Sequence, residues 1–263
     1  MFQPIVPDTG LVAWRFLQRT YDSQFETFQK NVTLQRDADY FREKIGSITR
    51  AEDLVKDRRL LGVALGAFGL QDDIDNRYFI RKILEDGTAS DDALAVRLAD
   101  TRYRDLSEAF GYGPRAEPKV GNANFAQTIV TRFETNAFEV AAGEQNPSMR
   151  VALYGQRALE DLATEDGSVN KKWYTLMGDP PMRQLMEKAL SLPSSVGQID
   201  IDRQLGIFKE RARAIFGSDD PAIFAEKEVR EKAITRFLLR EQVEALGTGL
   251  DGNAIALTLL STR

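Results

Sequence analysis

The sequence predicts an all-α protein made of two loosely duplicated multi-helix halves that form one body, closed by a long C-terminal helix and ended by short apolar tails. Apolar residues recur at three- and four-residue intervals along most of the chain, as they do on the buried face of a helix. Capping residues and glycines separate these stretches. A stretch of the first half also recurs in pattern in the second, which indicates an internal repeat.

The repeat is clearest in two stretches that begin at Asp57 and at Asp179. In both, apolar residues follow the Asp after three and six positions, Ala after ten, an apolar residue after eleven and Leu after thirteen. Pro180 and Pro181 follow the second Asp, and an Asp N-cap with Pro in the first turn is typical of a helix start. We therefore expect a new helix after each Asp, in halves that span residues 1–112 and 119–263.

The second half contains the clearest helical periodicities. Phe125, Ile129 and Phe133 recur at four-residue intervals, which indicates an amphipathic helix. A similar stripe spans residues 201–215, and the longest uninterrupted helical pattern spans residues 220–246. Each apolar stripe must be covered by another helix.

The two ends of the chain are apolar and are candidates for extended structure. Residues 254–260 contain no charge and no Pro, a composition that aggregates unless it is covered. This run either docks on its own protein, the ordinary arrangement for an apolar tail, or is covered by a partner. A short pairing with the apolar residues 2–6 is conceivable.

Composition limits the chemistry and the partners of this 263-residue chain. Its 35 basic and 40 acidic residues give a net charge of −5, and no run of Lys and Arg is suited to a phosphate backbone, so we expect no nucleic-acid partner. The chain has no Cys and no His. Thiolate nucleophiles and histidine-dependent catalysis are therefore excluded, and any catalysis would use carboxylates, Lys, Arg, Tyr or a bound hard cation. We expect no cofactor.

The N-terminus lacks the positive region and the continuous apolar core of a cleavable signal peptide. No window approaches the roughly 20 apolar residues of a membrane span. We expect synthesis in the cytoplasm without membrane insertion. Export by a dedicated machinery that recognises an uncleaved terminus remains an alternative.

Asp72, Asp73 and Asp75 form the strongest candidate for a metal site, because hard cations prefer carboxylate oxygens. An aspartate-rich magnesium motif would need an acidic residue where Asn76 stands, and a calcium loop would need a hinge Gly and a closing Glu that the chain lacks here. We therefore expect Asp75 to cap the following helix, Asp72 and Asp73 to be solvated, and no metal to be bound.

Aromatic residues beside cations are candidates for a protein-binding surface. Trp14 precedes Arg15, Trp173 follows two lysines, and Arg58 and Arg59 open the repeat helix. Such pairs are ordinarily surface side chains whose stems pack on the protein, but Trp and Arg also dominate interface hot spots. The second expected surface consists of Ile255, Leu257 and Leu259 in the apolar tail.

Several motifs resemble one protein family over nearly the whole chain. The most specific is the stretch over residues 54–70, which contains Leu-Val-Lys-Asp-Arg-Arg-Leu-Leu and Ala-Leu-Gly-Ala-Phe-Gly-Leu. Trp14, the triplet Asp39-Tyr40-Phe41 and residues 79–85 add to it. The chain resembles domain-of-unknown-function family 1217, which is found mostly in alphaproteobacteria and is often encoded within flagellar gene clusters. The resemblance implies a flagellum-associated protein and attaches no catalytic residue.

We therefore expect a non-enzymatic protein-binding or structural component associated with flagellar assembly or motility, with other proteins, flagellar components among them, as partners. Two alternatives remain. One is an exported axial component of the filament, rod or hook, whose apolar ends order on assembly. The other is a metal-dependent enzyme that uses Asp72, Asp73 and Asp75.

Overall fold

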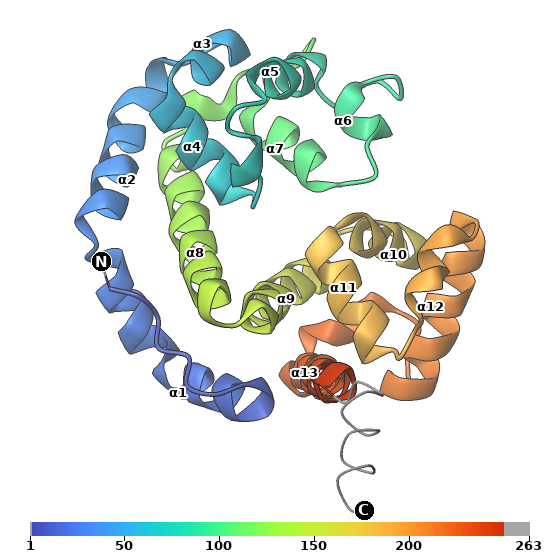
Figure 1. The fold of residues 1–263 in the computed structure, drawn as a ribbon. Coiled ribbons are helices and arrows are strands. Elements are labelled where there is room, and N and C mark those ends of the chain that lie inside the picture. The colour runs from blue at the N-terminus through green and yellow to red at the C-terminus, as the bar shows by residue number, and fades with distance from the viewer. Residues whose placement is uncertain (1, 250–263) are drawn as a thin grey trace, which may run out of the picture. The chain divides into compact units, whose positions relative to one another are not determined.

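The structure, a computed structural model, describes residues 2–249, and it describes side chains as far as Ala245. Thirteen α-helices and five short 3-10 helices form the regular structure, and no strand occurs between residues 2 and 249 (Figure 1). The predicted all-α fold is confirmed. Residues 2–6 have no regular structure, and the apolar run 254–260 lies outside the described residues.

The α-helices are, in chain order, α1 (Gly10–Gln29), α2 (Val32–Lys44), α3 (Ala51–Lys56), α4 (Arg58–Ala67), α5 (Arg77–Asp86), α6 (Leu94–Arg97), α7 (Arg102–Phe110), α8 (Phe125–Gln145), α9 (Pro147–Thr164), α10 (Val169–Gly178), α11 (Pro180–Ala189), α12 (Ile201–Phe216) and α13 (Lys227–Gly249). None of them is long and apolar enough to cross a membrane, as far as the structure describes the chain.

The chain divides into two compact units, which differ from the halves expected from sequence. Unit 1 contains the described residues up to Ile5, Thr20–Glu144 and Gly178–Pro180, and unit 2 contains the rest. The expected boundary at 113–118 does not separate them, because α8 follows that stretch and still packs its Phe125 and Ile129 into the core of unit 1. The duplication of the halves stays a prediction.

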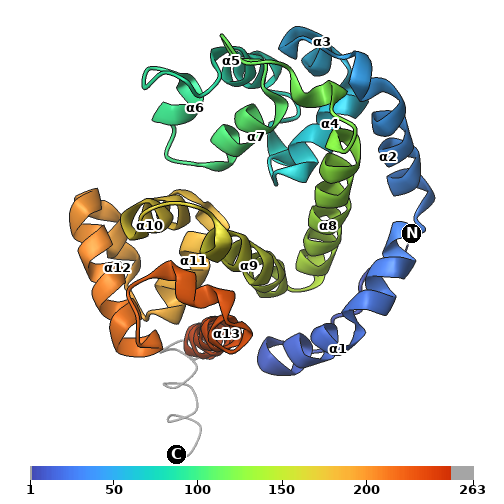
Figure 2. The same ribbon diagram turned by 180° about the vertical axis from the view of Figure 1, so that it is seen from behind.

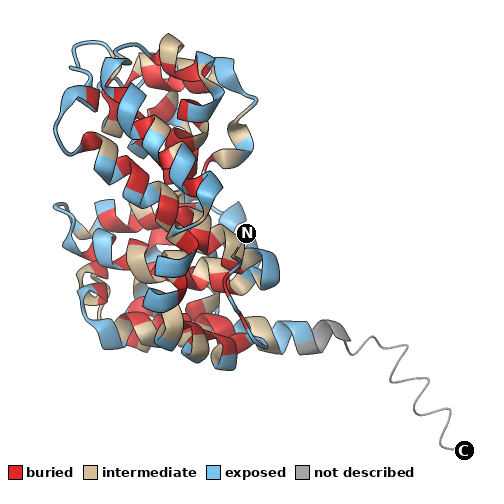
Figure 3. Ribbon diagram, turned by 90° about the vertical axis from the view of Figure 1, so that its left-hand side faces the viewer, coloured by how far each residue is buried: buried red, intermediate tan, exposed pale blue. Residues whose placement is uncertain are grey.

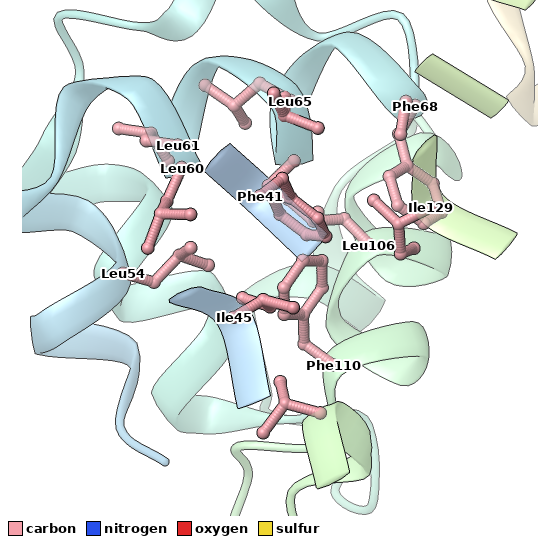
Figure 4. Close-up of a cluster of buried hydrophobic side chains, with 14 of the residues drawn as sticks. Phe41, Ile45, Leu54, Leu60, Leu61, Leu65, Phe68, Leu106, Phe110 and Ile129 are labelled. Carbon is pink, nitrogen blue, oxygen red and sulfur yellow. The ribbon is translucent and has the colours of Figure 1, made fainter. Parts of the chain in front are cut away.

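The core of unit 1 is built from α2, α3, α4, α5, α7 and the start of α8. Helix α8 lies alongside α4, where the Asn136 amide donates a hydrogen bond to the carbonyl of Ala67 at 2.7 Å (Figures 1 and 2). Phe41, Leu61, Leu106 and Phe110 are fully buried, and they converge from three helices (Figure 4). Each such side chain stabilises the fold by about 1.5–3 kcal/mol relative to an exposed one.

Unit 2 is built from α9 to α13 and from the part of α1 that ends at Arg19. Its core contains Trp173 of α10, Phe208 and Phe216 of α12, and Phe224 of a 3-10 turn that packs against α9. In both units, buried residues alternate with exposed ones along the helices, as amphipathic periodicity requires (Figure 3).

The long C-terminal helix is confirmed, but it begins later than expected. The stretch Pro221–Ala225 forms a separate 3-10 helix, with the Asp220 carboxylate accepting a hydrogen bond from the N–H of Ala222 at 2.9 Å. Glu226 then adopts an extended conformation, and α13 starts at Lys227. The helix ends at Gly249, a few residues beyond the expected helical pattern 220–246.

Candidate protein-interaction surfaces

Arg58 and Arg59 lie in the first turn of α4, in unit 1. The helix begins where expected, because the Asp57 carboxylate accepts hydrogen bonds from the N–H groups of Arg59 (2.9 Å) and Leu60 (3.0 Å). The Arg59 guanidinium lies over the Tyr40 ring, 4.7 Å from its centroid, and 3.3 Å from a carboxylate oxygen of Asp37.

The Arg58 guanidinium contacts the Asp75 carboxylate at 2.5 Å, with the two side chains 55% and 78% exposed. Arg58 and Arg59 thus both have acidic partners within unit 1. The two positions expected to form a binding surface are therefore brought together, with their charges partly compensated.

The Asp57 cap should make the stability of the protein depend on pH. Burial raises the pKa of the Asp57 carboxyl, but hydrogen bonds from the Tyr40 hydroxyl and from two backbone N–H groups outweigh it, so that the pKa lies below its ordinary 3.8. A carboxyl with a lowered pKa stabilises the fold above its unfolded-state pKa and loses this contribution as the pH falls through the folded-state pKa.

We expect Asp57→Asn to lower the free energy of unfolding by about 1 kcal/mol at pH 7, because the variant keeps a capping oxygen but loses the charge beside the helix N-terminus. The difference from the wild type should shrink as the pH falls below about 4. Urea unfolding at intervals between pH 3 and pH 7 measures it. A difference that stays constant over this range would contradict the assigned role of the charge.

The acidic cluster before α5 is not assembled as a metal site. Asp73 accepts hydrogen bonds from the Tyr103 hydroxyl at 2.5 Å and from the Asn76 amide at 2.7 Å, and burial together with this carboxylate raises the pKa of Tyr103. Asp75 pairs with Arg58 instead. No group of three or more acidic residues within the described part of the chain could hold a metal ion.

The expectation that Asp75 caps α5 is wrong. The N-cap is Asn76, whose side chain makes no capping hydrogen bond. The Arg58 side chain reaches Asp75 from the start of α4 and competes successfully for its carboxylate, because an ion pair with a guanidinium is a stronger hydrogen bond than one with a neutral N–H.

The two tryptophans are buried, so the expectation that they lie on the surface is wrong. Trp14 is 2% exposed and its indole N–H donates to Oε2 of Glu231 at 3.1 Å. Trp173 is fully buried, and its indole N–H donates to the carbonyl of Asp219 at 2.7 Å. Each ring has its polar edge satisfied inside unit 2, and neither is available to a partner in this structure.

Ile255, Leu257 and Leu259 lie outside the described residues. The preceding helix nevertheless exposes two apolar side chains, Leu239 at 45% and Val243 at 59%. They lie one turn apart on α13, a spacing that is visible in the sequence. Neither residue was among the binding residues expected from the sequence.

A basic hollow of about 620 Å³ occurs on unit 2. Val12, Arg15 and Arg19 of α1 line one side, and Lys227 from the first turn of α13 lines another. Trp14 and Glu231 also contribute. The 3.6-residue period predicts that Val12, Arg15 and Arg19 share a face of one helix, but only the fold brings Lys227 to them.

An apolar hollow of about 310 Å³ lies within unit 1, among α2, α4, α8 and the N-terminal segment. Half-buried Phe133, Ala137 and Val140 of α8 line it. Gly66 of α4 packs so closely on the Phe133 ring that an added Cβ would lie 2.8 Å from it. Gly66 therefore serves close packing of α4 against α8 at the edge of this hollow.

Comparison with known proteins identifies the family. Residues 67–224 match a family that is described as "Protein of unknown function (DUF1217)". The match runs from the end of α4 to the 3-10 helix before α13. The chain belongs to the DUF1217 family. No curated protein is significantly similar to it.

The fold of this family member is similar to that of a solved structure. The crystal structure of protein AGR_C_984 from Agrobacterium tumefaciens matches it with a TM-score of 0.73 and 22% sequence identity. The alignment covers 92% of this chain and 99% of the other. The comparison thus supports the all-α fold over almost the whole length.

Proposed function

We propose that the protein is a non-enzymatic, protein-binding component of flagellar assembly or motility, and that the end of α13 is its binding element. The observation that carries this proposal is the exposed pair Leu239 and Val243. The resemblance to proteins encoded in flagellar gene clusters supplies the flagellar part of the proposal.

The end of α13 is apolar on two sides. Ile234, Phe237 and Leu238 are fully buried against unit 2, whereas Leu239 and Val243 point away from that core. A helix that is apolar on both sides is normally covered on both. Leu239 and Val243 are already about half covered, so covering the rest with a partner would contribute for each about half of the roughly 1.5–3 kcal/mol that a fully exposed side chain gains.

Charged side chains lie beside this apolar pair. Lys188 of α11 contacts Glu241 and, at 2.8 Å, Glu244, and Arg240 contacts Glu244 at 3.1 Å. A polar rim around an apolar centre is typical of protein interfaces. In the sequence the apolar run 254–260 follows, with Ile255, Leu257 and Leu259, so the proposed binding element extends into it.

Val243→Asp tests the proposal, because it puts a charge into the proposed interface. We expect partner affinity to fall by about ten-fold or more, since each 1.4 kcal/mol is a factor of ten. Strains carrying the variant in place of the wild-type gene should form smaller swimming zones in soft agar, and the variant should retain less of any flagellar component that purifies with the wild type. Equal protein levels must be verified by immunoblot.

Val32→Asp is the matched control, since Val32 begins α2 in unit 1 and is 77% exposed. It introduces the same charge at a Val that is even more exposed than Val243 and should leave swimming unchanged. Normal swimming of the Val243→Asp strain would contradict the proposal. Fractionation separates the two flagellar alternatives, because an axial component must occur in sheared filaments or hook-basal bodies as well as in cells.

A further inference from the structure

The basic hollow of unit 2 contains cations without acidic partners. Arg15, Arg19 and Lys227 are all exposed, and none of them makes an ion pair with any residue that the structure describes. Among the other exposed arginines, Arg58 and Arg240 pair with carboxylates. The hollow therefore gathers three cations around one carboxylate, that of Glu231, on a chain whose net charge is −5.

Glu231, the acidic residue that lines the hollow, keeps its negative charge but is held in place by a hydrogen bond within unit 2. Glu231 accepts the indole N–H of Trp14 at 3.1 Å, which ties α13 to α1 beneath the cations. Gln18, on the same helix as the arginines, is held by the Gln156 side chain of α9. The walls of the hollow are thus fixed within unit 2, while the charged ends of Arg15, Arg19 and Lys227 remain available to a ligand.

Arg15 and Arg19 lie one helical turn apart, so their side chains start about 5–6 Å from each other. Two carboxylates one turn apart on a partner helix have the same spacing. Val12, which is 62% exposed, lies on the same face one turn before Arg15 and offers an apolar contact. Lys227 approaches from α13.

We infer that this hollow binds an acidic amphipathic helix of a protein partner, with carboxylates at Arg15 and Arg19 and an apolar side chain on Val12. Nucleic acid fits less well, because three cations would release few counterions and the chain as a whole repels phosphates. A partner with clustered carboxylates and an apolar side chain matches both the charge and Val12.

The inference deepens the proposed protein-binding function and rests on it for the class of partner, but it concerns a different surface. Lys227 and Val243 are 16 residues apart in α13, about 24 Å along a helix that rises 1.5 Å per residue. A negative result in the test of one surface therefore does not affect the test of the other surface.

The test uses fluorescence anisotropy of the full chain with a synthetic, fluorescein-labelled 18-residue helical peptide that carries Leu on one face and Glu at i, i+4 beside it. A second peptide has Lys in place of every Glu. We expect only the Glu peptide to bind, with an affinity that falls as salt rises. Arg15→Glu and, from the other helix, Lys227→Glu should each weaken binding by about ten-fold.

Arg203→Glu is the matched control, because Arg203 is exposed on α12 of the same unit and changes the net charge equally. It should change the affinity by less than two-fold, and so should Val243→Asp. Thermal melting of every variant verifies folding.

Three results would overturn the inference: equal binding of the Lys peptide, binding of the Glu peptide that survives both Arg15→Glu and Lys227→Glu, or full displacement of the Glu peptide by millimolar inorganic phosphate. The last result would indicate a simple anion site. Loss of peptide binding with intact Val243-dependent motility would reject this surface and leave the proposed function in place.

Discussion

Replacement of Phe138 by Ala is expected to lower the free energy of unfolding by about 3–5 kcal/mol, because it removes a buried aromatic ring and leaves a cavity. Phe138 of α8 is fully buried in unit 1, and three rings of α1 surround it. Tyr21, Phe25 and Phe28 make edge-to-face contacts with it, with centroids 5.2, 5.6 and 5.5 Å away. Such pairs add about 0.5–1.5 kcal/mol each beyond the area that they bury.

Urea unfolding followed by circular dichroism measures this loss. Phe138→Leu is the informative companion, since it keeps apolar volume but removes the ring, and we expect it to cost less than half as much as the Ala variant. A loss below about 1 kcal/mol for Phe138→Ala would show that α1 and α8 do not pack through this cluster, because large-to-small core substitutions rarely cost so little.

Trp173→Ala should have a comparable effect in unit 2. The ring is fully buried, lies edge-on to Phe208 with centroids 5.9 Å apart, and donates a hydrogen bond to the Asp219 carbonyl. We expect a loss of about 3–5 kcal/mol from the cavity. The substitution also leaves the carbonyl of Asp219 without this donor, which adds to the cost if water does not replace it.

Trp173→Phe separates the two contributions. It keeps most of the ring packing and removes the indole N–H. The free energy of unfolding that this variant loses therefore measures the contribution of the hydrogen bond together with that of the smaller cavity. Calorimetry and urea unfolding measure both variants. Wild-type stability in Trp173→Ala would show that the ring is not part of the core, and would restore it as a candidate for a surface contact.

The helical character and several helix boundaries could be predicted because they depend on neighbours in the sequence. Asp57 and Asp200 cap α4 and α12 through N–H groups two and three residues ahead. Gly217 ends α12 in the left-handed conformation, with a φ of 88° that favours glycine. In each case, the residues that make the interaction are adjacent in the chain.

The candidate surfaces could be predicted only in part. Arg58 and Arg59 were found as a pair because they are adjacent, but their compensation by Asp75 and Asp37 depends on α2 and on the loop before α5. Periodicity places Leu239 and Val243 one turn apart, yet it does not say which face of an apolar helix is left uncovered. The basic hollow needs Lys227, which no local pattern connects to α1.

The sequence by itself determined the all-α fold, the starts of α4 and α11, and the absence of histidine and cysteine chemistry. Only the tertiary structure decided which residues are buried and how the chain divides into units. Trp14 illustrates the reason, because the partner of its indole N–H, Glu231, is 217 residues away in the sequence. Caps and periodicity act over one helical turn, whereas burial and ion pairing depend on residues that come together only when the chain folds.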